Sequence, residues 1–168
     1  NEVGDLFGKG RMFLPELIIA AEAMRQVTDV INSALETAGG SVQKAGRILI
    51  ATVQGDVHDI GKTIVVSLFK ANGFDVLDLG RDVPNEKIIE AAGNFQPDIN
   101  GTSALLTTTM PAQQKLEKEL KKAGLKGKIK TIVGGAPVTQ RWAQRIGADA
   151  YAQDASDGVL QAKALLGL

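Results

Sequence analysis

Residues 47–62 read RILIATVQGDVHDIGK, and this stretch decides the fold class. Its first part, residues 47–53, is a short aliphatic run that predicts a buried β-strand. A polar loop containing a glycine follows, and then an apolar pattern with helical spacing begins. Further strand-like runs lie along the rest of the chain, at residues 75–79, 98–103, 129–133 and 148–152.

Helical patterns separate these strands, at residues 60–71, 84–93, 110–123, 138–146 and 155–166. This alternation predicts an α/β fold, in which helices cover both faces of a five-stranded parallel sheet. Because crossovers are right-handed, we expect the flavodoxin-like (Rossmann-like) strand order 2-1-3-4-5. Ligands of such sheets bind where the order reverses, which directs attention to the segments after Val53 and Gly101.

The N-terminal region has a different pattern. Apolar residues at helical spacing predict one helix over residues 12–38, and residues 3–7 look like the tail of an earlier helix. We expect residues 1–40 to form a partial helical cap domain and residues 41–168 to form the Rossmann-like domain. The first residues resemble neither a signal peptide nor an initiator start, so we expect a fragment cut inside a helix.

The composition narrows the function classes. The 168 residues are 44% hydrophobic and 23% charged, and 19 basic side chains balance 19 acidic ones. Without a basic excess, we expect neither a nucleic-acid nor a membrane partner. The absence of cysteine excludes disulfides and thiolate-bound metals, and it is compatible with the cytoplasm, where we expect the protein.

His58 is the sole histidine of the chain, and it falls in the loop after the first predicted strand. A neutral imidazole is a common metal ligand, and a carboxylate such as Asp56 often orients it. One histidine without cysteine cannot build a tight zinc site, but it can supply the axial ligand of a metal held by a macrocycle. The loop also lacks the glycine spacing of a dinucleotide site.

Three short motifs resemble those of a known family. Asp56-x-His58-x-x-Gly61 resembles the D-x-H-x-x-G signature of proteins that hold cobalamin base-off, with histidine on cobalt. Ser103-Ala104-Leu105 looks like the S-x-L motif of that family, and Gly134-Gly135 looks like its GG motif. The motifs follow predicted strands 1, 3 and 4, and the resemblance covers nearly the whole chain.

The N-terminal segment VGDLFGKGRMFLPEL, residues 3–17, is similar to the helical cap of methionine synthase and of methyltransferase corrinoid proteins. In that family the cap covers the methyl-bearing face of the corrin. The resemblance implies that Phe7, Leu14 and Leu17 supply apolar contacts to that face.

The resemblance also implies the remaining site residues. Ser103 would hydrogen-bond the benzimidazole base, and Thr109 would link through Asp56 to His58, the cobalt ligand. Thr107 is expected in the same pocket, and Tyr151, Ala155 and Ser156 near the far end of the nucleotide tail. The other expected cofactor-binding residues are Val57, Asp59, Ile60, Gly61, Gly101, Leu105, Gly134 and Gly135.

A function follows from the resemblance. It implies a corrinoid protein that carries a methyl group on the cobalt of cobalamin, and is not itself a catalyst. A substrate:corrinoid methyltransferase would load the methyl group, and a corrinoid:tetrahydrofolate or corrinoid:coenzyme M methyltransferase would remove it. A reductive activase is a further expected partner. The alternatives are the cobalamin module of a methionine synthase and the binding domain of an adenosylcobalamin mutase or regulator.

Overall fold

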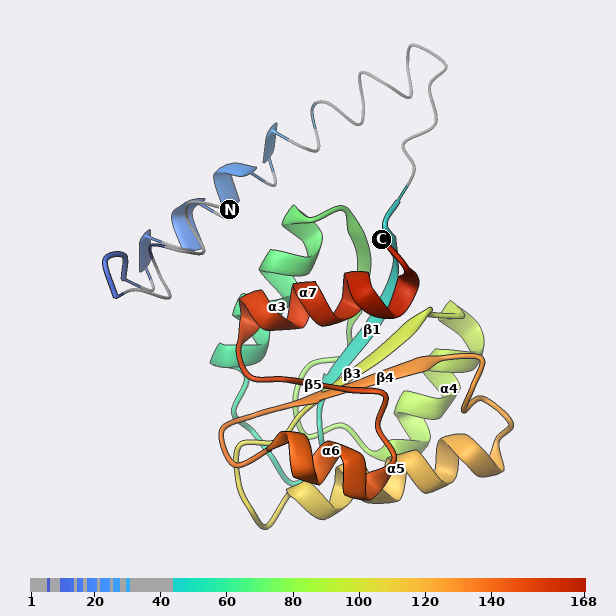
Figure 1. The fold of residues 1–168 in the computed structure, drawn as a ribbon. Helices are drawn as coiled ribbons and strands as arrows, with labels where there is room; N and C mark the ends of the chain where they lie inside the picture. Colours follow the sequence, from blue (N-terminus) through green and yellow to red (C-terminus); the bar gives the residue numbers. More distant parts are fainter. Residues whose placement is uncertain are drawn as a thin grey trace, which may run out of the picture.

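The computed structural model describes residues 6, 10–13, 15, 16, 18–20, 22–24, 26, 27, 30 and 44–168. Its centre is a parallel sheet with the strand order β2-β1-β3-β4-β5 (Figure 1). This arrangement confirms the predicted flavodoxin-like fold. The strands are β1 (Gly46–Thr52), β2 (Phe74–Asp78), β3 (Ile99–Ser103), β4 (Lys130–Gly134) and β5 (Ala150–Ala152).

Helices cover both faces of the sheet. Helix α3 and helix α7 share one apolar cluster with β1 and lie on the same face (Figure 1). The remaining helices α4, α5 and α6 pack on the opposite face. The helices are α3 (Ile60–Ala71), α4 (Asn85–Phe95), α5 (Met110–Lys122), α6 (Gln140–Ile146) and α7 (Ala155–Leu166).

Side-chain alternation along β1 divides the core between these two faces. Ile48 and Ile50 point toward α3 and α7, whereas Leu49 and Ala51 point toward α4 and α5. These four side chains are buried, as expected for a central strand covered on both sides. The aliphatic run therefore forms the middle of the molecule, and the loop that carries His58 leaves from its carboxyl end.

The predicted element bounds hold closely in this domain. The observed bounds of α3 and α7 are the predicted ones, while β1 ends at Thr52, one residue early. Val53 forms an isolated bridge with Val83 because the chain has begun to turn toward the loop.

The N-terminal region is described at scattered positions, and those between residues 15 and 30 are helical, in agreement with the predicted helix. The two-domain division stays a prediction. Among the helices that the structure describes, none is long and apolar enough to cross a membrane.

Candidate functional site

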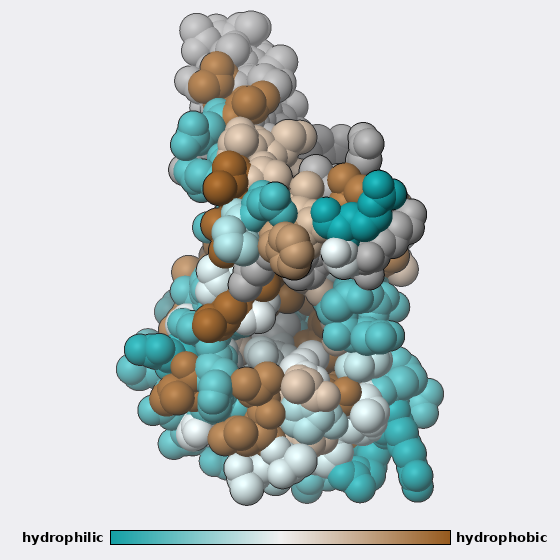
Figure 2. Space-filling model, turned by 90° about the vertical axis from the view of Figure 1, so that its left-hand side faces the viewer, coloured by the Kyte–Doolittle hydropathy of each residue, from teal (hydrophilic) through white to brown (hydrophobic). Residues whose placement is uncertain are grey.

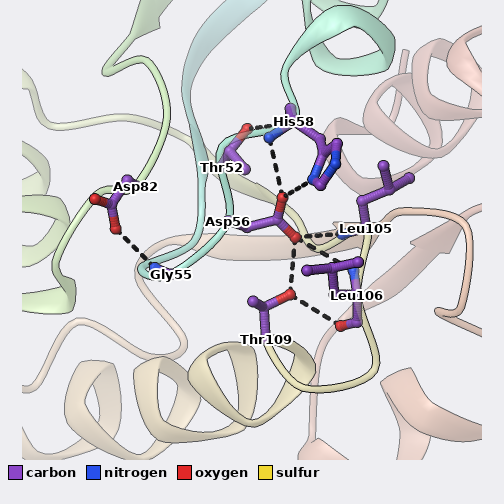
Figure 3. A network of polar contacts seen from close by, with 8 residues as sticks. All are labelled: Thr52, Gly55, Asp56, His58, Asp82, Leu105, Leu106 and Thr109. Carbon is purple, nitrogen blue, oxygen red and sulfur yellow. Dashed lines mark hydrogen bonds and ion pairs between the residues drawn. The ribbon is translucent and has the colours of Figure 1, made fainter.

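The loop after β1 is fixed by hydrogen bonds to the loop after β2. Gly55 has a left-handed backbone, with φ of +83°, and its N–H donates to the Asp82 carboxylate at 2.7 Å (Figure 3). The Asp82 N–H donates in return to the Asp56 carbonyl at 2.9 Å. This pair of bonds turns the chain sharply after the strand and directs the Asp56 side chain inward.

Asp56 is fully buried and accepts hydrogen bonds from two loops. One carboxylate oxygen accepts from the Leu105 N–H at 2.7 Å and from the Thr109 hydroxyl at 2.8 Å. The other oxygen lies 2.8 Å from Nδ1 of His58 and accepts the His58 N–H at 3.1 Å (Figure 3). The structure thus brings together His58, Asp56 and Thr109, which the resemblance had placed in one relay.

These contacts keep Asp56 ionised. Burial alone raises the pKa of the Asp56 carboxyl, but the donors from Leu105, Thr109 and His58 outweigh burial and lower that pKa to about 2. An ionised carboxylate can only accept hydrogen bonds, so Nδ1 of His58 must carry a proton. In the neutral ring, Nε2 then keeps its lone pair.

The His58 ring lies partly open, with 48% of its side chain exposed. Its carbonyl accepts a hydrogen bond from the Thr52 hydroxyl at 3.2 Å, which fixes the backbone. Within the described part of the chain, no hydrogen bond is made by Nε2. The imidazole is therefore held by one nitrogen and presents the other outward, as a metal-ligating histidine does.

A pocket of about 550 Å³ opens beside His58 and runs between the sheet and helices α3 and α7. Apolar residues gather around the hollow on the side of the molecule seen in Figure 2. Val57 and Ile60 near its mouth are 57% and 70% exposed, so an apolar rim faces solvent there. The predicted residues that line this pocket are Val57, His58, Asp59, Ile60, Gly61, Gly101, Ser103, Leu105, Gly134, Gly135 and Ala155.

The glycines in the pocket wall serve two different purposes. A Cβ at Gly61 would meet no heavy atom within 4 Å, so the missing side chain leaves open space in the pocket. A Cβ at Gly135 would lie 1.9 Å from the Ala104 carbonyl oxygen. Gly135, with φ of +121°, is therefore required by the close approach of two loops.

Several expected site residues are not brought to the pocket. Thr107 lies on the exposed loop between β3 and α5 and does not line the pocket. Tyr151 packs against the α6 side of the sheet because strand alternation turns its neighbour Ala152 toward the pocket. Ser156 does not line the pocket, whereas its neighbour Ala155 does. Phe7, Leu14 and Leu17 lie outside the described residues.

Other pocket residues were missed from the sequence. Gln153 and Asp154 follow β5, so the rule that ligands bind at carboxyl ends of strands could have found them. Lys62 and Arg81 also line the pocket. Lys62 could not be identified from the sequence, because a lysine in the first turn of a helix is usually exposed to solvent.

Together the fold and the pocket define a class: α/β proteins that receive a cofactor at the carboxyl edge of a parallel sheet. Within that class, the chain belongs to the B12-binding family. Residues 46–161 match the family model described as a B12 binding domain, and residues 1–32 match a second model with the same description. This membership confirms the expected cofactor, a cobalt-containing corrinoid.

Named relatives share about half of their aligned residues with the chain. Trimethylamine corrinoid protein 2 of Methanosarcina acetivorans is 48% identical, over 98% of this chain and 76% of that protein. Dimethylamine corrinoid protein 3 of Methanosarcina mazei is 48% identical, over 99% of both chains. The methanol:cobalamin methyltransferase complex of Methanosarcina barkeri contains a chain with 35% identity and a TM-score of 0.83, over 98% of this chain and 62% of that one.

Proposed function

We propose that this protein carries a methyl group on a corrinoid held base-off, with His58 as the axial ligand of cobalt. The observation that carries the proposal is the contact between Asp56 and Nδ1 of His58, which leaves Nε2 free at the mouth of the pocket. The apolar rim fits a flat macrocycle, and the pocket beneath it fits the tail of that macrocycle. A methyl-carrying corrinoid protein agrees with the relatives named above.

The bound corrinoid would supply a cobalt atom that accepts and releases the methyl group. The chain supplies the rest. His58 would hold the cobalt through Nε2. The ionised Asp56 would orient the imidazole through its contact with Nδ1. The Thr109 hydroxyl, 2.8 Å from Asp56, holds that carboxylate in place.

The pocket would bury the nucleotide tail of the cofactor. Ser103 lies in the pocket wall, where its hydroxyl is available to the lower base. The pocket wall gains no side-chain volume from Gly61, Gly101 and Gly134. Covering of the upper face by Phe7, Leu14 and Leu17 stays a prediction, as do cofactor contacts of Thr107 and Tyr151.

The proposed partners are methyltransferases. The names of the relatives favour a methylamine as the methyl donor, with a methylamine:corrinoid methyltransferase as the loading partner. A methyltransferase to coenzyme M or tetrahydrofolate would unload the methyl group, and a reductive activase would restore oxidised cobalt. We expect these encounters in the cytoplasm.

Visible spectroscopy of the reconstituted protein tests the proposal. We expect the wild type to take up methylcobalamin and to show the spectrum of a base-off corrinoid with histidine on cobalt. The variant His58→Ala should lose this spectrum, because no other imidazole is present in the chain. Absence of corrinoid uptake, or an unchanged spectrum in His58→Ala, would overturn the assignment.

A further inference from the structure

A buried lysine in the pocket wall is not used by the proposed mechanism. Lys62 lies in the first turn of α3, four residues after His58, and its side chain is 1% exposed. Its ammonium group donates to both carboxylate oxygens of Asp78, the last residue of β2. A lysine is rarely buried unless it is paired, so this ion pair has a structural reason to be kept.

The ion pair continues into a chain of contacts that returns to His58. The Asp78 carboxylate also accepts the Gly80 N–H at 2.9 Å. The Gly80 carbonyl accepts the Thr52 N–H at 2.9 Å, and the Thr52 hydroxyl donates to the His58 carbonyl at 3.2 Å. The segment from His58 to Lys62 is thus connected to Thr52 of β1 at one end and to Asp78 of β2 at the other.

The Asp56 contacts hold the same loop from the other side. Asp56 connects the loop to the segment between β3 and α5, through Leu105 and Thr109. Lys62 connects it to β2, the neighbour of β1 on the opposite flank. Asp56 fixes the imidazole tautomer and ring, whereas Lys62 fixes the position of the helix turn that follows the ring.

Stability alone is a poor explanation for this pair. Replacing a buried ion pair by apolar side chains of similar volume often leaves a protein equally stable or makes it more stable. An ion pair that uses both carboxylate oxygens does, however, restrict the position of the helix turn more than an apolar contact would. Lys62 and Asp78 therefore have the properties of a positioning device.

We propose that the Lys62–Asp78 ion pair positions His58 for ligation of cobalt. Lys62 is a positioning residue, since it acts through the loop and not on the metal. This inference rests on the proposed function, in which His58 is the axial ligand. The pair would hold the turn from residue 58 to residue 62 in place, and with it the His58 ring at the pocket.

The test compares Lys62→Met with Lys126→Met in the full chain. Lys126 is the control, because its ammonium also pairs with a carboxylate, that of Glu117, at 2.7 Å. It lies beyond the pocket lining, and its second carboxylate partner is Asp149. Both variants should lower Tm, because each leaves a carboxylate without its ammonium partner: Asp78, 29% exposed, in Lys62→Met, and the buried Glu117 in Lys126→Met.

Only Lys62→Met should affect the bond to cobalt. We expect its Kd for methylcobalamin to rise about 10-fold or more, as for other groups that orient metal ligands. The visible spectrum of loaded Lys62→Met should shift toward that of His58→Ala, whereas the spectrum of Lys126→Met should match that of wild type. In the apo-protein, amide hydrogen exchange of residues 58–63 should accelerate in Lys62→Met and stay unchanged in Lys126→Met.

The double variant Lys62→Met/Asp78→Leu keeps the test decisive if Lys62→Met does not fold. Removing both charges should restore Tm but not the affinity, the visible spectrum or the slow exchange. The inference is overturned if wild type binds methylcobalamin and the Lys62 variants match Lys126→Met in all three measurements. If wild type takes up no methylcobalamin, the proposed function itself falls, and the inference falls with it.

Discussion

At the scale of single residues, the charge of Asp56 affects both the site and the stability of the protein in acid. Its pKa in the folded state, about 2, lies below the ordinary value of 3.8. The charged carboxylate therefore stabilises the fold fully above about pH 4, and this stabilisation is lost as the pH falls toward 2.

The variant Asp56→Asn tests this pH dependence. At pH 6 the variant should be less stable than wild type, and the pH-dependent part of the difference should be about 1–2 kcal/mol after allowance for solvent screening at the open pocket. That part should disappear toward pH 2. Urea unfolding of both apo-proteins at several pH values measures it. A difference that stays constant between pH 6 and pH 2 would contradict the account.

Thr109 offers a second test at this scale. Its buried hydroxyl donates to Asp56, and hydrogen bonds to charged groups contribute about 1.5–3 kcal/mol. Thr109→Val should lose this amount in urea unfolding and raise the pKa of Asp56 toward its usual range. Thr109→Ser keeps the hydroxyl and should lose less than about 1 kcal/mol. A larger loss in Thr109→Ser than in Thr109→Val would show that the methyl group matters more than the hydroxyl.

At the scale of the elements, two glycines in helices have similar surroundings, but only one of them lies at the pocket. Gly61 in α3 and Gly93 in α4 are both exposed, and a Cβ at either would meet no heavy atom within 4 Å. Gly61 lines the pocket and Gly93 does not. The comparison therefore separates helix propensity from occupation of the pocket.

Substitution of these glycines should give opposite results for stability and for binding. Alanine at either position should stabilise the apo-protein by about 0.5–1 kcal/mol, because glycine is a poor helix former. Gly61→Leu should reduce methylcobalamin uptake by filling the pocket, whereas Gly93→Leu should not. Thermal unfolding and equilibrium binding measure the two effects. Normal uptake by Gly61→Leu would show that the cofactor does not pass this wall.

The elements were predictable from sequence to different degrees. The strand order followed from alternating strands and helices, because handed crossovers leave few topologies. The side-chain direction of Tyr151 did not follow, because β5 has three residues and sets no clear alternation. The contact from Asp56 to Thr109 was expected through family resemblance, since no local pattern joins residues 53 positions apart.

At the scale of the whole molecule, the cofactor should act as a stabilising ligand. A ligand that binds the folded state alone adds about 2.7 kcal/mol at one hundred times its Kd. Methylcobalamin should therefore raise Tm of the wild type, and the rise should be smaller in His58→Ala. A thermal scan at fixed protein concentration, with and without methylcobalamin, measures both shifts. Equal shifts in the two proteins would show that His58 adds nothing to affinity.

The bond between Asp56 and Leu105 has a consequence for the timing of biosynthesis. Its partners lie 49 residues apart, and the pocket also needs β4, the segment after β5 and helix α7. During synthesis, the loop that carries His58 therefore leaves the ribosome before the residues that complete the pocket around it. The growing chain therefore does not yet have a complete binding site for the cofactor. Loading of the corrinoid therefore has to wait until helix α7 has been synthesised and has joined the sheet.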